Sequence, residues 1–452
     1  MRIEKILKAV PQYQVFPSVS EIYNRIRKLS KKDGFSVSII GKSEGGHPIH
    51  RVKFGTGRIR VLFAAYPHPN EPIGGLTVLT LISLLHEGHP ALRNLPIEWN
   101  FVPCPDPDGV MANEGWMRKS FSFKRYLDQY YRPPHDRQIE WSFPVRYKKA
   151  RFGRPMKGTR ALMKALKQVK PDFYFSLHNS MFGGAYYFIS KDLGPKYFGQ
   201  LYRLLRVLGI PLHRGEPEVD WVREYSPAIY GEVTFKGMYD RLAESFADPT
   251  DHWNGGASSF DYLRRFNPRS LTLVFETAFA LHPLSRSIKL SGENRRHLML
   301  KTIASQKFLT SLALEHWRET RAVLDKTSVL YPAVRSLMEK QAKTLTELDK
   351  RLLTSKSYDR LATESERLDI YLTWFIYLCT INQFVRLLRN SRAVSAVAAA
   401  QVLSTEIRSQ YRQIDAAINF DSFRNFEVRD LVRAQLGSGL IALGALLKGS
   451  SK

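Results

Sequence analysis

The chain has 452 residues, too many for one ordinary hydrophobic core, so we expect one large domain and one smaller one. Its 44% hydrophobic content is that of a soluble globular protein, and its net charge of +26 favours anionic partners. The two cysteines, Cys104 and Cys379, exclude a disulfide framework and suit a reducing compartment. The N-terminal stretch has no long apolar core and no small-residue cleavage site, so we expect a cytoplasmic protein without a signal peptide.

The first part of the chain alternates predicted strands and helices. A helix is predicted at 74–88, and strands are predicted at 36–40, 50–55, 58–66, 97–104, 172–180, 185–190 and 271–278. Several of these strands are almost continuously apolar, which indicates burial on both faces. For residues 1–290 we therefore predict an α/β domain with a mixed, mostly parallel sheet flanked by helices.

Near residue 290 the composition changes. No glycine occurs between Tyr331 and Gly437, and Pro332 is the last proline. The loss of both helix breakers predicts that residues 291–452 form an all-α C-terminal domain, an appended bundle with helices at 293–326, 332–354, 358–390, 393–418 and 427–448. The apolar run at 370–385 is short for a membrane span, so we expect a buried helix and no membrane contact. This domain could cover the active site, dock a partner or form a homodimer.

Side chains that can bind a metal or transfer a proton lie at or just after the ends of three of the predicted strands. His68 and Glu71 lie in "AAYPHPNEPIGG", His178 ends "FYFSLH", and Glu276 ends "LVFE". Imidazole and carboxylate ligands suit Zn²⁺, and a catalytic zinc needs three protein ligands and one open position. Glu276 is the candidate base, because strand interiors rarely bury an unpaired glutamate. The alternatives are a surface histidine beside a helix start, where Glu71 favours the helix dipole, and a satisfied core histidine at position 178.

The order and spacing of His68-x-x-Glu71, His178 and Glu276 resemble the zinc carboxypeptidases, the M14 family of metallopeptidases. The resemblance covers roughly residues 16–282. It implies one Zn²⁺ per chain, held by His68, Glu71 and His178. It also implies that Glu276 takes a proton from the attacking water and passes it to the leaving amine.

The turn "PDPDG" resembles the family's Asn-Pro-Asp-Gly turn. Its Asp108 would then orient a ligating histidine, a role that Asp106 or Asp172 could also take.

The resemblance further implies arginines that contact the substrate. Arg118 in "GWMRKS" resembles the arginine that polarises the scissile carbonyl, and Arg125 in "SFKRYL" resembles the one that clamps a C-terminal carboxylate. Arg132 is a third candidate for substrate binding. The alternative for each of these arginines is a position on a basic surface exposed to solvent.

Three further residues are candidates for substrate binding. His252 and Trp253 lie near the place where the family often carries a tyrosine that closes over substrate. Phe260 falls in "GGASSFDY", which resembles the segment lining the specificity pocket, and a phenylalanine there argues against a basic substrate side chain.

The leading hypothesis is a zinc carboxypeptidase that acts on an anionic or small peptide or acyl-amino-acid substrate. The basic residues between positions 116 and 170 would rim the site and steer anions towards it, although a solubilising surface explains them equally. We expect no nucleic-acid partner, since no binding module is recognisable. The alternatives are a γ-glutamyl or N-acyl amide hydrolase of the same family and a non-catalytic binding protein on this fold.

Overall fold

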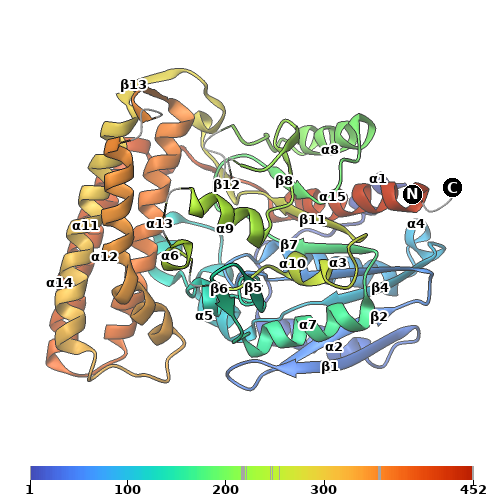
Figure 1. Cartoon of the computed structure of the whole chain (residues 1–452). Helices are drawn as coiled ribbons and strands as arrows, with labels where there is room; N and C mark the ends of the chain where they lie inside the picture. Colours follow the sequence, from blue (N-terminus) through green and yellow to red (C-terminus); the bar gives the residue numbers. More distant parts are fainter. Residues whose placement is uncertain are drawn as a thin grey trace.

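The structure is a computed structural model that describes residues 2–214, 219, 221–244, 246, 248–253, 255–354 and 358–449. A nine-stranded sheet forms the centre of its first part (Figure 1). In spatial order the strands are β1 (Phe35–Lys42), β2 (Pro48–Phe54), β4 (Ile97–Val102), β3 (Ile59–Ala65), β7 (Phe173–Leu177), β11 (Leu271–Glu276), β8 (Tyr186–Ile189), β10 (Ile229–Gly231) and β9 (Glu224–Ser226). Three small two-stranded sheets accompany it: β5 (Val145–Tyr147) with β6 (Ala150–Phe152), β12 (Ala280–Leu281) with β15 (Arg424–Asn425), and β13 (Leu290–Asn294) with β14 (Leu361–Thr363).

The helices of this first part surround the large sheet. They are α1 (Ile3–Lys8), α2 (Val19–Leu29), α3 (Ile73–His86), α4 (Pro90–Arg93), α5 (Pro107–Met117), α6 (Phe123–Gln129), α7 (Lys157–Val169), α8 (Pro195–Val207), α9 (Phe235–Ala243) and α10 (Ser259–Arg264). The central strands β4, β3, β7 and β11 run parallel, and antiparallel strands flank them on both sides. The predicted α/β fold with a mixed, mostly parallel sheet is confirmed.

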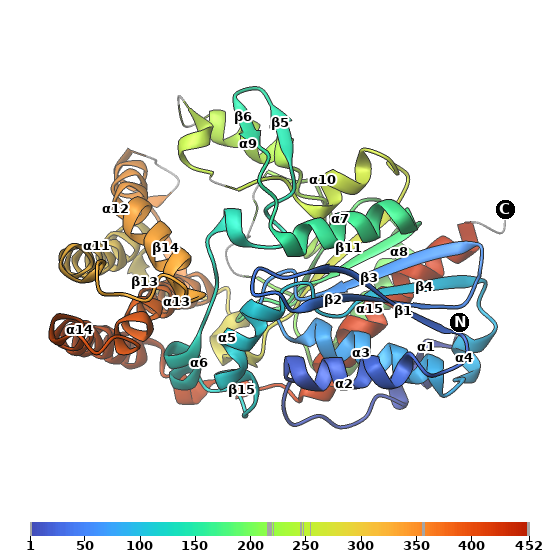
Figure 2. The same cartoon turned by 90° about the horizontal axis from the view of Figure 1, so that it is seen from below.

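Successive side chains of each central strand are buried on opposite faces of the sheet. In β3, Val61 and Phe63 point to the face covered by α3 and α15, whereas Leu62 and Ala64 point to the face covered by α7. Figure 2 shows α7, α9 and α10 above the sheet and α2 and α3 below it. Burial on both faces explains why these strands are almost continuously apolar in sequence.

The predicted long helices are present in the second part of the chain. They are α11 (Arg295–Thr320), α12 (Leu330–Thr354), α13 (Glu364–Arg389), α14 (Val394–Ile418) and α15 (Val428–Gly449). A capping box of Thr363 and Glu366 begins α13. This helix packs against α11, α12 and α14 and lies on the side of their bundle that faces the sheet (Figure 2). The buried apolar side chains of this bundle belong to the same continuous cluster as those under the sheet. The boundary at residue 290 stays a prediction.

The helix at 427–448 lies elsewhere than predicted. We expected it in the appended bundle, but α15 lies on the large sheet and packs against α3 and α8. A Cβ at Gly439 would come within 2.8 Å of two ring atoms of Phe175 on β7, so glycine permits this close approach. Ser438 and Tyr187 of β8 share a hydrogen bond of 3.1 Å. The apolar pattern of α15 is satisfied by the sheet rather than by other helices.

Two of these helices, α13 and the 428–448 part of α15, are long and apolar enough to cross a membrane. In the structure, 78% and 67% of their most apolar windows are buried inside the fold. That burial is typical of core helices, as predicted for 370–385.

Candidate metal and catalytic site

Neighbouring parallel strands bring the predicted ligands to one edge of the sheet. β3 ends at Ala65, just before His68 and Glu71, and β7 ends at Leu177, just before His178. Because β3 and β7 pair in parallel, their carboxyl ends meet at the same edge. Ligand atoms of the three side chains lie within 4.8 Å of one another, and all three residues are buried.

The chemistry of this group fits Zn²⁺. His68 Nδ1 is buried and has no hydrogen-bond partner among the residues that the structure describes. Burial, followed by the nearby Arg132 and His178, lowers the pKa of His68 well below its usual range. The imidazole is therefore neutral, which is the form that binds a metal. Two imidazoles and one carboxylate would leave the fourth position of a tetrahedral site open.

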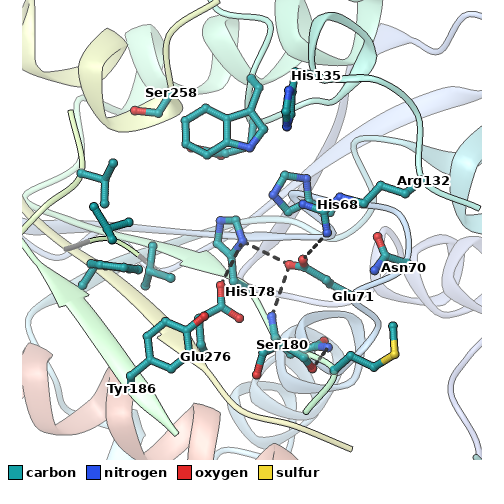
Figure 3. Close-up of a pocket in the computed structure, with 18 of the residues that line it drawn as sticks. His68, Asn70, Glu71, Arg132, His135, His178, Ser180, Tyr186, Ser258 and Glu276 are labelled. Atoms are coloured by element: carbon teal, nitrogen blue, oxygen red, sulfur yellow. Dashed lines mark hydrogen bonds and ion pairs between the residues drawn. The ribbon is translucent and has the colours of Figure 1, made fainter. Parts of the chain in front are cut away.

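Glu71 is fixed from three directions (Figure 3). Its Oε2 lies 3.1 Å from His178 Nδ1 and accepts a hydrogen bond of 3.3 Å from the N–H of Asn179. Its Oε1 accepts a hydrogen bond of 3.2 Å from Arg132 Nη1. The Asn179 side-chain oxygen accepts the N–H of Ile73, the first residue of α3, at 3.2 Å. These bonds tie the carboxylate to β7 and to the start of α3.

Glu276 stands beside this group, on the strand next to β7. It is the last residue of β11, is 7% exposed, and has its Oε1 3.7 Å from His178 Nδ1. Figure 3 shows Glu276 and Glu71 on two sides of His178. A carboxylate placed next to a metal site, without belonging to it, is suited to proton transfer.

The four side chains open into a cavity of about 530 Å³. Its walls are largely apolar and aromatic, and include Trp141, Trp253, Phe260 and Val274. Of the described residues that line the cavity, only Arg132 carries a guanidinium or ammonium group. The predicted substrate residues Trp253, Phe260 and Arg132 therefore share the cavity with the metal group.

Two of the predicted arginines lie elsewhere. Arg118 forms an ion pair of 2.5 Å with Glu21 of α2 and donates a hydrogen bond to the carbonyl of Phe16. Arg125 donates a hydrogen bond to the carbonyl of Ser120. Neither arginine lines the cavity. The structure does not support their predicted roles at the scissile carbonyl and the terminal carboxylate, because local contacts hold both side chains outside the cavity.

The predicted cap and the predicted orienting carboxylates also differ from expectation. His252 stacks on Phe246, with ring centroids 3.6 Å apart, and does not line the cavity. Asp106 accepts a hydrogen bond from a backbone N–H at the start of α5, and Asp172 accepts one from the N–H of a residue in β3. Asp108 accepts hydrogen bonds from the first hairpin. Among the described residues, none of these three carboxylates bonds to a ligating histidine.

Arg386 of α13 connects the helical region to the segment that carries Arg132. This role was not predicted from the sequence. Arg386 donates hydrogen bonds to three backbone carbonyls, of Gln129 at 2.8 Å, Tyr130 at 2.7 Å and Ala112 at 3.0 Å. Burial lowers its pKa to about 10. These bonds fix the segment that ends in Arg132. An arginine in a helix has no sequence signal that separates this role from solvent exposure.

Other residues of α13 and α15 contact Arg132 and His178 or line the cavity. Gln383 of α13 accepts the N–H of Arg132 at 3.3 Å, and Ile376 of the same helix lines the cavity. Gln435 of α15 donates a hydrogen bond of 2.7 Å to the carbonyl of His178. Both α13 and α15 therefore belong to the structure of the site.

Of the comparisons with known proteins, only the one with solved structures finds similar chains. No family model and no curated protein matches the chain. Among solved structures, the carboxypeptidase A of Helicoverpa armigera is 13% identical over 58% of this chain and 65% of its own, with a TM-score of 0.40. The metallo-carboxypeptidase of Burkholderia cenocepacia is 16% identical over 57% and 60%, with a TM-score of 0.33. Bovine thrombin-activatable fibrinolysis inhibitor is 11% identical over 75% and 97%, with a TM-score of 0.36. The chain is similar to metallo-carboxypeptidases at this remote level, spans less than two thirds of the first two, and the assignment below relies on its own site geometry.

Proposed function

We propose that this protein is a zinc-dependent hydrolase that cleaves a peptide bond or a related amide bond. The observation that carries the proposal is the meeting of His68, Glu71 and His178 in one cavity with Glu276, whose Oε1 is 3.7 Å from His178 Nδ1. A Zn²⁺ in such a group acidifies a water molecule and polarises the substrate carbonyl. A binding protein would have no need for a buried carboxylate beside the ligands, so the non-catalytic alternative is not favoured.

Glu276 acts as the proton carrier. It accepts a proton from the water that attacks the carbonyl carbon and donates that proton to the nitrogen of the departing amine. Its position at the end of a buried strand holds the carboxylate in one place, which lowers the entropy cost of both transfers.

Arg132 has two effects in this arrangement. Its hydrogen bond holds the Glu71 carboxylate in one orientation. Because it also lines the cavity, its positive charge stabilises the oxygen of the scissile carbonyl as negative charge develops there.

Cleavage at a free C-terminus is the first candidate within this class, with Arg132 as the ligand of the terminal carboxylate. The second candidate is a γ-glutamyl or N-acyl amide hydrolase. Its support is the position of Arg118 and Arg125 outside the cavity, which leaves Arg132 as the single described cation for both tasks. The basic surface would steer an anionic substrate towards the opening in either case.

Paired substrates separate the candidates. Zinc-loaded protein is given N-acyl dipeptides that differ only in a free or an amidated C-terminus, with Glu276→Gln as the control for the chemistry. Hydrolysis of either substrate that requires both zinc and Glu276 supports the proposed function. A preference for the free acid of 10-fold or more supports C-terminal cleavage, and equal rates support the amide hydrolase. Turnover that survives zinc removal contradicts the proposal.

A further inference from the structure

Glu140 is a buried carboxylate in the wall of the same cavity, and the chemistry proposed above does not use it. It is 1% exposed and lines the cavity together with His178 and Phe260. It lies against β7, through Ser176, and against the first residue of α10, Ser259. It is therefore an acidic group on the side of the cavity where β7 meets α10.

Among the residues that the structure describes, the side chains and backbone groups that donate hydrogen bonds to the Glu140 carboxylate are all neutral. Its Oε1 accepts hydrogen bonds from the N–H of Ser259 at 3.0 Å and from its hydroxyl at 2.7 Å. Its Oε2 accepts one long hydrogen bond of 3.4 Å from the hydroxyl of Ser176. A carboxylate can accept about four hydrogen bonds, so Oε2 keeps acceptor capacity.

No lysine or arginine among the described residues forms an ion pair with Glu140. Burial raises the pKa of Glu140. Among the neighbouring side chains, Asp261, which is itself acidic, also raises this pKa, and His178, a proposed metal ligand, acts in the opposite direction. A carboxylate that is buried without a cation is destabilising, and a cationic ligand removes that penalty.

The walls around Glu140 suit the rest of such a ligand. Trp253, Phe260, Val274 and Phe188 line the same cavity. Apolar walls bury an alkyl stem, and aromatic faces attract a cation. Phe260 by itself predicted that basic side chains are excluded, but the carboxylate beside it supplies the missing partner.

We propose that Glu140 selects a substrate in which the part that enters this cavity carries a primary ammonium group on an apolar stem. The inference rests on the proposed hydrolase function and names its substrate class. An anionic remainder of the substrate would still suit the basic exterior.

A purely structural role for Glu140 is the competing explanation, since it bonds the first turn of α10. Binding of small probes separates the two. n-Pentylamine, which is protonated at pH 7.5, is compared with 1-pentanol and pentanoate by calorimetry. Zinc-loaded and metal-free protein are both used, because agreement between them excludes coordination of the amine to zinc.

The variants are Glu140→Gln, which keeps the shape and the acceptor for Ser259, and Glu339→Gln as a matched control on the exposed surface of α12. We expect the ammonium probe to bind about 10- to 100-fold more tightly than pentanol, as for a hydrogen bond to a charged group in a buried site. Glu140→Gln should abolish that preference and leave pentanol binding unchanged, and Glu339→Gln should change neither.

Three outcomes would overturn the inference: equal binding of amine and alcohol to the unmodified protein, tighter binding of pentanoate, or loss of both amine and alcohol binding in a folded Glu140→Gln protein. Thermal melting verifies that the variant is folded. Because the probes are not hydrolysed, selective amine binding without any hydrolase activity would contradict only the proposed function. Hydrolysis without amine preference would contradict only the role of Glu140.

Discussion

Two regions surround the cavity, and they are built on different principles. The edge of the sheet collects its chemical groups because β3, β7 and β11 are parallel neighbours that end at the same level. The wall formed by α13 contributes an apolar side chain, Ile376, and holds the Arg132 segment through hydrogen bonds to its backbone. The sheet therefore fixes the reacting groups, whereas the helix fixes a neighbouring loop. Changes at the sheet edge should abolish chemistry, and changes on α13 should weaken it.

The largest effect is expected at the ligands. His178→Ala removes one of two imidazoles and leaves Glu71 without its nearest partner, so stoichiometric zinc and all measurable activity should be lost together. Metal analysis of the purified protein measures the first, and turnover of the paired substrates measures the second. One zinc per chain retained in this variant would contradict the ligand assignment.

Glu276→Gln should separate chemistry from metal binding within the same region. The amide cannot carry a proton, so kcat should fall by a factor of about 10²–10⁴ or more while the zinc content stays at one per chain. Rapid-mixing kinetics with a chromogenic substrate measures the fall. Near-normal kcat would remove Glu276 from the mechanism.

Arg386→Ala tests the α13 wall. Three backbone carbonyls would lose their donor, which should cost about 1–3 kcal/mol in the free energy of unfolding. We expect kcat/KM to fall roughly 10-fold through a displaced Arg132, with zinc still bound. Denaturant unfolding, metal analysis and kinetics on one preparation measure all three.

The matched control for that experiment is Arg412→Ala, which removes an exposed arginine from α14. It should change none of the three quantities. If Arg386→Ala kept full activity despite lower stability, the helix would support the fold but not the site.

The smallest effect concerns Asp106, away from both regions. Burial raises its pKa from 3.8 to about 7, so its charged form is disfavoured in the folded protein. Its contribution to stability is then greatest below pH 4 and is lost as the pH rises through 7. Asp106→Asn, which can still cap α5, should raise the free energy of unfolding by at least about 1 kcal/mol at pH 8, since one pKa unit is about 1.4 kcal/mol. At pH 4 the two proteins should unfold alike, and a constant difference at both values would contradict the assignment.

The metal group was predictable from the sequence because its signals are local. His68 and His178 each follow an apolar strand, and parallel pairing of those strands is enough to bring them together. The arginines were not predictable in the same way. Arg118 pairs with Glu21, 97 residues away, and nothing in the surrounding residues identifies that partner.

The packing partner of the helix at 427–448 was also not predictable from the sequence, because it depends on contacts with residues far away in the chain. Composition predicts that 427–448 is a helix, but an apolar helix face fits a bundle and a sheet equally well. The contact of Gly439 with Phe175 decides between them, and it joins residues 264 positions apart (439 − 175). Glu140 was visible only as a rare acid in a basic segment, because its burial depends on β7 and α10.

The position of α15 on the large sheet affects the order in which parts of the protein can fold. Chains are synthesised from the N-terminus, and early segments begin to fold first. The apolar face of β7 and β11 stays uncovered until residues 428–449 have emerged, and Gln435 reaches the carbonyl of His178 only then. A nascent chain that already contains every proposed ligand therefore lacks the helix that completes their support. Such an order delays the support of the proposed metal group until residues 428–449 have been synthesised.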